Sequence, residues 1–315
     1  MKHPVEANDY LIATKPIGEY ANWCVALIES GMPGKAMTSA YRMGKSRATR
    51  WVVSNKTALL HEDVPIFILP QRFHSSITPK KLFSHILEAT GHPLRSGDES
   101  VLRSRIIVQL GEMTEHMDRK RVVMFVDEAQ WLNRLAYHLL INLANELDVI
   151  GIRLIVILVA SPELDGIIAR YRTLKRGHIV GRFMSDVTHL NGIDSAGTLA
   201  HAWSQYDTKQ IFPEGSGISF TRAFAGDRFS AGLTMHSLAQ NAWDVMEQVF
   251  RQSGGTGVLS LPMQAVTLVA NEVLLRVVGL LDPPYLIGSD TWANILDQVG
   301  FMEQMALVQM TQADK

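Results

Sequence analysis

The sequence predicts an α/β domain with a central, mostly parallel sheet, followed by a smaller domain made only of helices. The first observation is that short apolar runs alternate with helix-like segments up to about residue 192. That alternation is typical of parallel strands joined by crossover helices, which lie in layers on the sheet. The second observation is that only helix-like segments follow. We therefore expect a three-layer domain at 1–192, with an N-terminal extension and helix at 1–34, and a helical domain at 193–315.

Five short segments are predicted to be strands. The clearest covers residues 122–126, an unbroken run with three valines that is typical of a strand buried on both faces. The other predicted strands are residues 35–38, 64–69, 154–160 and 186–190. Between them, Thr78 followed by Pro79 predicts a helix that begins with a capping side chain and a proline in its first turn. The helices expected in the second domain lie at 196–205, 230–252, 261–281 and 291–308.

The composition is that of an ordinary globular protein, with 47% hydrophobic and 19% charged residues among 315. The net charge is −1, so no global field draws the chain to nucleic acid, and a DNA contact must be a local patch. The single cysteine, Cys24, excludes an internal disulfide and lies in an apolar stretch that predicts a buried thiol. Residues 1–6 carry no apolar signal core and no run is an uninterrupted membrane span, so we expect a soluble, cytoplasmic protein.

Gly44-Lys45-Ser46 is the first motif with a chemical meaning, because it lies between a predicted strand and a predicted helix. Backbone N–H groups at the start of a helix point toward bound phosphates, and the helix dipole favours negative charge there. We expect Lys45 to reach the β- and γ-phosphates of ATP and the Ser46 hydroxyl to ligate Mg²⁺. A surface loop before a helix is the alternative reading of so short a motif.

The wider loop departs from the phosphate-loop pattern at one position. Ser39 stands where the pattern has its first glycine, which predicts a loop that is less tightly turned. The nucleotide-binding residues expected from the loop are Ser39, Arg42, Met43, Gly44, Lys45, Ser46 and Arg47.

Asp127 and Glu128 form the second motif, directly after the predicted strand at 122–126. Ligands of open α/β sheets bind outside the carboxyl ends of the strands. We expect Asp127 to hold Mg²⁺, directly or through water, and Glu128 to polarise the attacking water. A solvated acidic turn is the alternative, but the two motifs occur in the order that a nucleotide site requires.

These segments resemble AAA+ ATPases of the TniB/TnsC type, which are transposition regulators. The resemblance rests on the loop 41–48, the segment 125–130 with its Asp-Glu-Ala-Gln, and the segment 160–164. It implies a P-loop AAA+ domain followed by a helical lid, and ATP-dependent homo-oligomers on DNA that recruit or activate a transposase. A lid arginine that contacts the nucleotide is not identified in the sequence, and the candidates are Arg222, Arg228 and Arg276.

The resemblance also assigns roles after the strand at 154–160. Ser161 stands where AAA+ proteins have a polar residue that senses the γ-phosphate, although a plain strand-ending serine is the alternative. A basic stretch follows, with Arg170, Arg172, Lys175, Arg176, His178 and Arg182. An arginine in it could act as a finger in a neighbouring subunit's site, with Arg182 the first choice and Arg176 the second. A solvated helix face is the alternative for each residue.

Three functions remain compatible with this site. The leading one is a DNA-associated regulator of a mobile element, and the others are a nucleotide-gated signalling or defence switch and a helicase-loader type replication factor. DNA-stimulated ATP hydrolysis would separate the first from the second. The basic patch expected to contact DNA would draw on Arg103, Arg105, Arg119, Lys120 and Arg121.

Overall fold

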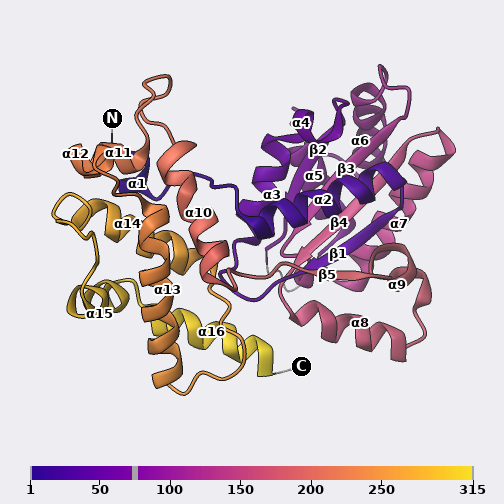
Figure 1. The fold of residues 1–315 in the computed structure, drawn as a ribbon. Coiled ribbons are helices and arrows are strands. Elements are labelled where there is room, and N and C mark those ends of the chain that lie inside the picture. Colours follow the sequence, from indigo (N-terminus) through magenta and orange to yellow (C-terminus); the bar gives the residue numbers. More distant parts are fainter. Residues whose placement is uncertain (1, 73–76, 314–315) are drawn as a thin grey trace. The chain divides into compact units, whose positions relative to one another are not determined.

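The computed structural model describes residues 2–72 and 77–313. The chain divides into two compact units, one built around a β-sheet and the other built of helices (Figure 1). The sheet unit contains Tyr20–Ser39 and Lys45–Leu190. The helical unit contains Met1–Glu19, Ala40–Gly44 and Asn191–Lys315.

The sheet has five strands in the order β2-β3-β4-β1-β5, and each strand is parallel to its neighbours. The strands are β1 (Gly34–Thr38), β2 (Ile66–Pro70), β3 (Arg121–Asp127), β4 (Arg153–Ala160) and β5 (Val187–His189). The predicted α/β fold with a parallel sheet is therefore confirmed, and each predicted run contains or overlaps a strand. Because β4 lies between β1 and β3, the strands that precede the two motifs are separated by one strand only.

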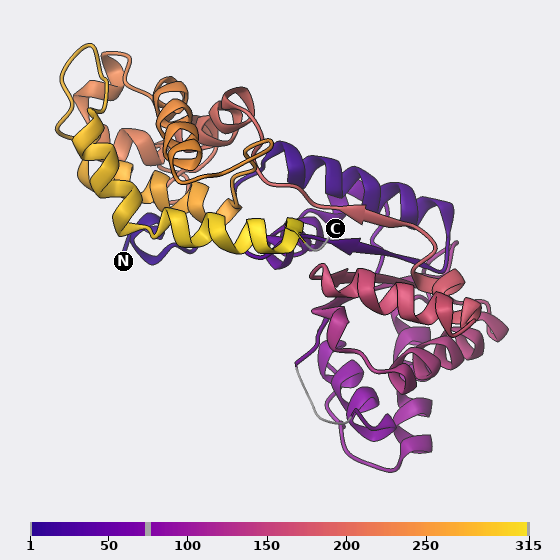
Figure 2. The same ribbon diagram turned by 90° about the horizontal axis from the view of Figure 1, so that it is seen from below.

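Helices cover both faces of the sheet (Figures 1 and 2). On β3, Val122, Met124 and Val126 belong to the core that the sheet shares with the helices within residues 79–183. Val123 and Phe125 alternate with them, as side chains on a strand must, and are buried on the opposite face, which α2 (Lys15–Ser30) and α3 (Lys45–Ser54) cover. This two-sided burial is the reason that the run is apolar throughout.

The helices of the sheet unit begin and end at recognisable residues. Thr78 caps α5 by accepting a hydrogen bond from the Lys81 N–H at 3.3 Å, and Asn133 caps α7 by accepting from the Ala136 N–H at 2.9 Å. The helices, with one short 3₁₀ turn, are α2 (Lys15–Ser30), α3 (Lys45–Ser54), α4 (Lys56–Leu60), α5 (Pro79–Ala89), α6 (Glu99–Met113), η1 (Ala129–Trp131), α7 (Arg134–Val149), α8 (Glu163–Thr173) and α9 (Gly177–Phe183). The buried thiol of Cys24 on α2 matches the prediction for that residue.

The helical unit is built around large aromatic side chains, and Trp203 and Trp292 are fully buried in it. The N-terminal segment takes part in this core, because the Tyr10 hydroxyl donates to Asn271 Oδ1 and also hydrogen-bonds the Tyr206 hydroxyl at 3.0 Å. The helices are α1 (Pro4–Ala7), α10 (Ala196–Thr208), α11 (Phe220–Ala225), α12 (Asp227–Ser230), α13 (Met235–Gln252), α14 (Met263–Arg276), α15 (Ser289–Gln298) and α16 (Phe301–Ala313). Within 2–72 and 77–313, no helix combines the length and the apolar character that a membrane span needs.

Two helix predictions in this unit were wrong. The helix expected at 230–252 begins only at Met235, because Thr234 and Ser237 form a capping box that starts a new helix. The helix expected at 291–308 is two helices, since Gly300 between them has a φ of +59°, a left-handed value that glycine adopts without strain.

Candidate nucleotide-binding and hydrolysis site

The strand ends bring three of the predicted catalytic and metal-binding residues, Asp127, Glu128 and Ser161, to one edge of the sheet. In the register of the strands, Thr38 of β1 lies beside Ala160 of β4, and Asp127 of β3 lies beside Val159 of β4. Ser161 follows β4 directly. This is the edge of an open α/β sheet at which ligands bind.

Ser39 stands where the loop pattern has its first glycine. It is buried and hydrogen-bonds two neighbouring segments of the chain. Its backbone N–H donates to Ala160 O at 3.1 Å, and its hydroxyl donates to Leu190 O at 2.8 Å. The hydroxyl therefore fastens the end of β1 to the segment that follows β5. A glycine could not make this second bond, so the departure from the loop pattern has a structural reason.

Lys45 and Ser46 are the first two residues of α3, and both face Asp127. The Ser46 hydroxyl hydrogen-bonds the Asp127 carboxylate, and the Lys45 ammonium, on a side chain that is only 8% exposed, interacts with it electrostatically. The predicted pair from the phosphate loop and the predicted carboxylate from β3 are thus brought together within the sheet unit.

Burial raises the pKa of Asp127 above its ordinary value. The hydrogen bond from Ser46 opposes this rise, the nearby charge of Glu128 adds to it, and the Glu128 N–H and Lys45 oppose it again. A half-buried carboxylate whose charged form is disfavoured gains from a bound cation. A hydroxyl and a carboxylate are also oxygen ligands of the kind Mg²⁺ prefers, so these residues fit a nucleotide-bound Mg²⁺.

Glu128 is joined to the end of β4 through Gln130. The Gln130 side chain donates from Nε2 to Glu128 Oε2 at 2.5 Å and accepts from the Ser161 N–H at 3.2 Å. Glu128 itself has a left-handed φ of +56°, a conformation that is uncommon outside glycine and concentrates at functional sites. Gln130 was part of the Asp-Glu-Ala-Gln segment in the sequence but was not predicted as a site residue.

Replacing Gln130 with alanine should lower kcat for ATP hydrolysis about tenfold and leave KM nearly unchanged, because Gln130 touches the candidate base and not the phosphate loop. Gln130→Glu should lower kcat as well, since a second carboxylate repels Glu128 instead of donating a hydrogen bond to it. Steady-state phosphate release across a pH series measures both effects. Unchanged kcat in both variants would show that Gln130 does not position Glu128.

Two further polar side chains at this edge lack partners within the described part of the chain. The Ser161 hydroxyl and the Gln71 amide nitrogen are both buried without a hydrogen bond. Gln71 follows β2, and its backbone N–H donates to Asp127 O at 2.9 Å. The sequence analysis predicted Ser161 as a site residue but missed Gln71. Both are polar residues that directly follow a buried strand. An unpaired buried polar group is costly, which suits a site that completes its hydrogen bonds with a ligand.

The middle of the loop, residues 40–44, packs within the helical unit. The Gln264 N–H donates to Arg42 O at 3.2 Å, and Arg42 Nη1 donates to Gln264 Oε1 at 2.5 Å. Gly44 has a φ of +91°, and a Cβ on it would lie 3.3 Å from Cβ of Met263. Met43 is buried and Arg47 is half-buried on α3. Contact of Arg42, Met43 and Arg47 with nucleotide stays a prediction.

The candidate arginines fall into two groups. Arg228 and Arg276 of the helical unit are already paired, with Asp282 at 3.6 Å and Glu272 at 2.9 Å, whereas Arg222 is exposed on α11. Arg182, on α9, is half-buried, and its Nε lacks a hydrogen-bond partner among the described residues. Arg182 is therefore a candidate finger whose guanidinium still has an unused donor.

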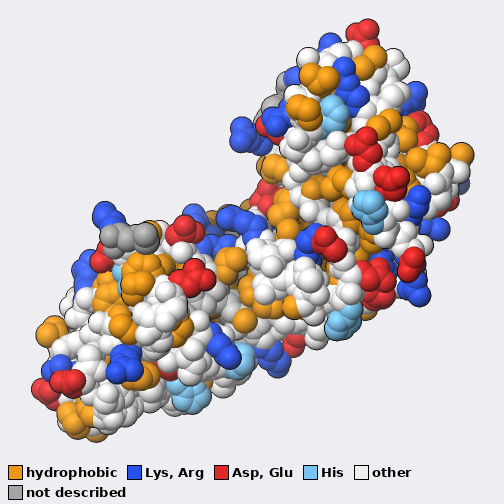
Figure 3. Space-filling view, turned by 90° about the horizontal axis from the view of Figure 1, so that it is seen from above, with side chains coloured by type: hydrophobic (Ala, Val, Ile, Leu, Met, Phe, Trp, Pro, Cys, Tyr) orange, Lys and Arg blue, Asp and Glu red, His pale blue; other side chains and the backbone are white. Residues whose placement is uncertain are grey.

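Three of the five residues in the basic patch predicted to contact DNA have carboxylate partners within the protein. Arg103 pairs with Glu146 at 3.0 Å, and Arg121 pairs with Glu29 and Glu62. Arg119 lies 3.9 Å from Glu29. On the face shown in Figure 3, basic side chains are scattered among acidic and apolar ones.

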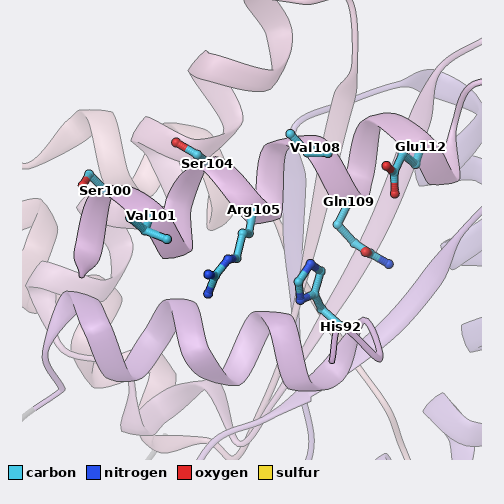
Figure 4. Close-up of a pocket in the computed structure, with 8 residues that line it drawn as sticks. All are labelled: His92, Ser100, Val101, Ser104, Arg105, Val108, Gln109 and Glu112. Carbon is cyan, nitrogen blue, oxygen red and sulfur yellow. The ribbon is translucent and has the colours of Figure 1, made fainter. Parts of the chain in front are cut away.

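Arg105 of that predicted patch points from α6 into a surface pocket of ≈ 400 Å³ (Figure 4). Its Nη1 donates to Ser96 O at 2.6 Å, so the guanidinium holds the loop before α6. His92 and exposed Val108 line the same pocket. None of the predicted nucleotide residues lines it.

Comparison with known proteins shows a partial family match and similar folds. Residues 38–168 match the family model described as an AAA domain. Similar solved structures include the ORC2 protein of Aeropyrum pernix in ADPNP–ADP complexes, at 13% identity over 86% of this chain and 71% of that chain, with a TM-score of 0.49. The ORC1 protein of the same organism in complex with DNA is 12% identical over 92% of this chain and 84% of that chain, with a TM-score of 0.43. Cdc6p from Pyrobaculum aerophilum is 13% identical over 100% of this chain and 90% of that chain, with a TM-score of 0.46. No curated protein matches the sequence significantly.

The matched segment contains Lys45, Ser46, Asp127, Glu128 and Ser161. These are the residues that the sheet unit gathers at one edge. Residues 38–168 therefore resemble an AAA domain, and this similarity supports ATPase activity.

Proposed function

We propose that the protein is a cytoplasmic ATP-binding and ATP-hydrolysing regulator that assembles on DNA and recruits or activates a transposase. The observation that carries the ATPase part is the convergence of Lys45 and Ser46 with Asp127 and Glu128 at the carboxyl edge of the sheet. The transposition part rests on the resemblance of three motif segments to TniB/TnsC-type regulators, and the helical unit takes the place of the lid.

Each side chain has a defined task in this proposal. Lys45 orients the β- and γ-phosphates, and Ser46 and Asp127 hold Mg²⁺, which offsets phosphate charge when it is bound. Glu128, held by Gln130, accepts a proton from the attacking water. Ser161 directs its free hydroxyl to the γ-phosphate or to that water.

Arg182 is proposed to act on the nucleotide of a neighbouring subunit. Arg182→Ala and Lys45→Ala proteins should each be inactive, and mixing them should restore part of the hydrolysis, because a mixed interface pairs an intact site with an intact finger. Phosphate release from the mixture measures the effect, with each variant alone as the control. If mixed oligomers form and hydrolysis does not recover, Arg182 is not a finger in trans.

DNA binding should depend on ATP and on DNA length, and hardly on sequence. The net charge of −1 gives a single subunit little attraction to phosphates, so several subunits assembled by ATP must add their weak contacts along one duplex. Affinity should therefore fall linearly with salt on logarithmic axes, with a slope of about −0.9 for each phosphate contact. Fluorescence anisotropy on short and long duplexes, with and without a non-hydrolysable ATP analogue, measures this.

A scrambled duplex and the Lys45→Ala protein are the matched controls for that experiment. The wild-type protein should bind the scrambled duplex as tightly as the original duplex. The Lys45→Ala protein should bind neither of the two duplexes. Undetectable binding to long duplex with the analogue at low salt would overturn the DNA proposal. The internal pairing of Arg103, Arg119 and Arg121 would then favour the second candidate, a nucleotide-gated switch that acts on a protein.

A further inference from the structure

A second hollow in the sheet unit is lined by cations. It has a volume of ≈ 390 Å³ and lies where the start of α7 meets α8. Its lining residues are Leu132, Asn133, Arg134, Ile167, Arg170, Tyr171, Leu174 and Arg176. We call it the arginine pocket. None of its residues belongs to the phosphate loop or to the strand-end residues described above, although Arg176 is also the second-choice candidate for the finger.

The three arginines of this pocket have no counter-charge among the described residues. Arg134, Arg170 and Arg176 form no ion pair and no side-chain hydrogen bond within residues 2–72 and 77–313. Arg103 and Arg121, elsewhere in the same unit, each have a carboxylate partner within 3.2 Å. Three guanidinium groups around one hollow repel one another, and no anion in the described part of the chain offsets that cost.

The surroundings of the pocket are also positive. Burial lowers the pKa of His138, and the nearby charges of His178, Arg134 and Arg176 lower it further. The rings of His138 and His178 are 5.1 Å apart. The first turn of α7, a helix of 16 residues, adds the partial positive charge of a helix N-terminus at Arg134.

Tyr171 gives the pocket a rigid wall. Its side chain is only 8% exposed, and its ring meets the ring of Tyr137 edge-on at 6.0 Å. The Arg176 guanidinium lies 6.0 Å from the centre of the Tyr171 ring, within the range of a cation–π contact. This contact restrains one of the three cations before a ligand arrives, which lowers the entropic cost of binding.

We propose that the arginine pocket is a second phosphate site that binds a compact polyphosphate, such as the diphosphate or triphosphate group of a nucleotide. Guanidinium groups pair with phosphate oxygens through two parallel hydrogen bonds, and three of them require several oxyanions close together. A diphosphate supplies several charges over a short length. A hollow of ≈ 390 Å³ encloses such a group, whereas a duplex presents single phosphates spaced along a convex backbone.

Inorganic pyrophosphate is the probe, and the Lys45→Ala protein is the background, so that binding at the phosphate loop is removed. Isothermal titration at low salt should show pyrophosphate binding in this background. Adding Arg170→Gln or Arg176→Gln should weaken that binding about tenfold for each lost charge-assisted contact. The thermal midpoint of each protein shows that the fold is retained.

Arg172→Gln is the matched control, because Arg172 is an exposed arginine on the same helix that does not line the pocket. It should change pyrophosphate affinity less than about twofold, since a distant surface charge contributes little. Equal weakening by Arg172→Gln and Arg170→Gln would show a diffuse charge effect and overturn the proposal. So would the absence of pyrophosphate binding in the Lys45→Ala background.

Duplex DNA distinguishes the two sources of phosphate. At equal phosphate concentration, short duplex should not displace pyrophosphate from the Lys45→Ala protein. If it does, or if the pocket substitutions weaken DNA binding while pyrophosphate does not bind, the pocket is a nucleic-acid contact and the proposal is wrong. Because the background cannot use the phosphate loop, this result is independent of whether the protein hydrolyses ATP or assembles on DNA.

Discussion

Replacing Glu128 with glutamine should reduce ATP turnover by about 100-fold or more while ATP binding stays near normal, because the amide keeps the shape of the side chain but cannot accept a proton. Gln130 can still reach the new side chain, so the link to Ser161 should survive in part. Steady-state phosphate release gives the turnover, and a fluorescent ATP analogue gives the binding.

Glu112→Gln is the control for this substitution. Glu112 is an exposed carboxylate on α6, and it lines the surface pocket of Arg105, which contains none of the predicted nucleotide residues. It should hydrolyse ATP at the normal rate. Normal turnover in Glu128→Gln would remove Glu128 from the role of general base.

Lys45→Ala should weaken ATP binding on the order of 100-fold, because an ammonium that reaches two phosphates makes charge-assisted hydrogen bonds that alanine cannot replace. The 8% exposure of Lys45 means that water screens these bonds poorly. Titration with a fluorescent ATP analogue measures the loss.

Lys81→Ala, an exposed lysine on α5, should bind ATP normally and serves as the control. The thermal midpoint of Lys45→Ala without nucleotide should also be recorded, since Lys45 stabilises the Asp127 carboxylate. Wild-type affinity in Lys45→Ala would show that the phosphate loop is not the nucleotide site.

The sequence predicted the strands and the strand-end carboxylates because both are local properties. Residues 122–126 are apolar at every position, and Asp127 follows the last of them whatever the rest of the chain does. The breaks before Met235 and at Gly300 were missed because the apolar pattern continues across them, and only the capping side chains and one left-handed residue interrupt the helix.

The features that sequence reasoning missed depend on partners distant in the chain. Gln130 can hold Glu128 only because β4 lies beside β3 and presents the Ser161 N–H. Arg121 is neutralised by Glu29 and Glu62, which lie 92 and 59 residues away in the sequence. A cluster of basic residues in the sequence therefore does not reveal which of them form ion pairs with carboxylates, as Arg121 does, and which, like Arg170, form none among the described residues.

The hydrogen bonds of Tyr10 set an order for synthesis of the protein. Its two partners, Tyr206 and Asn271, lie 196 and 261 residues further along the chain. Because synthesis runs from the N-terminal to the C-terminal side, Tyr10 is made long before either partner, and it can form these two hydrogen bonds only after residues 206 and 271 have been made. All residues of the sheet unit, Tyr20–Ser39 and Lys45–Leu190, are made in that interval, so the chain can begin to order the sheet before the N-terminal segment joins its own core.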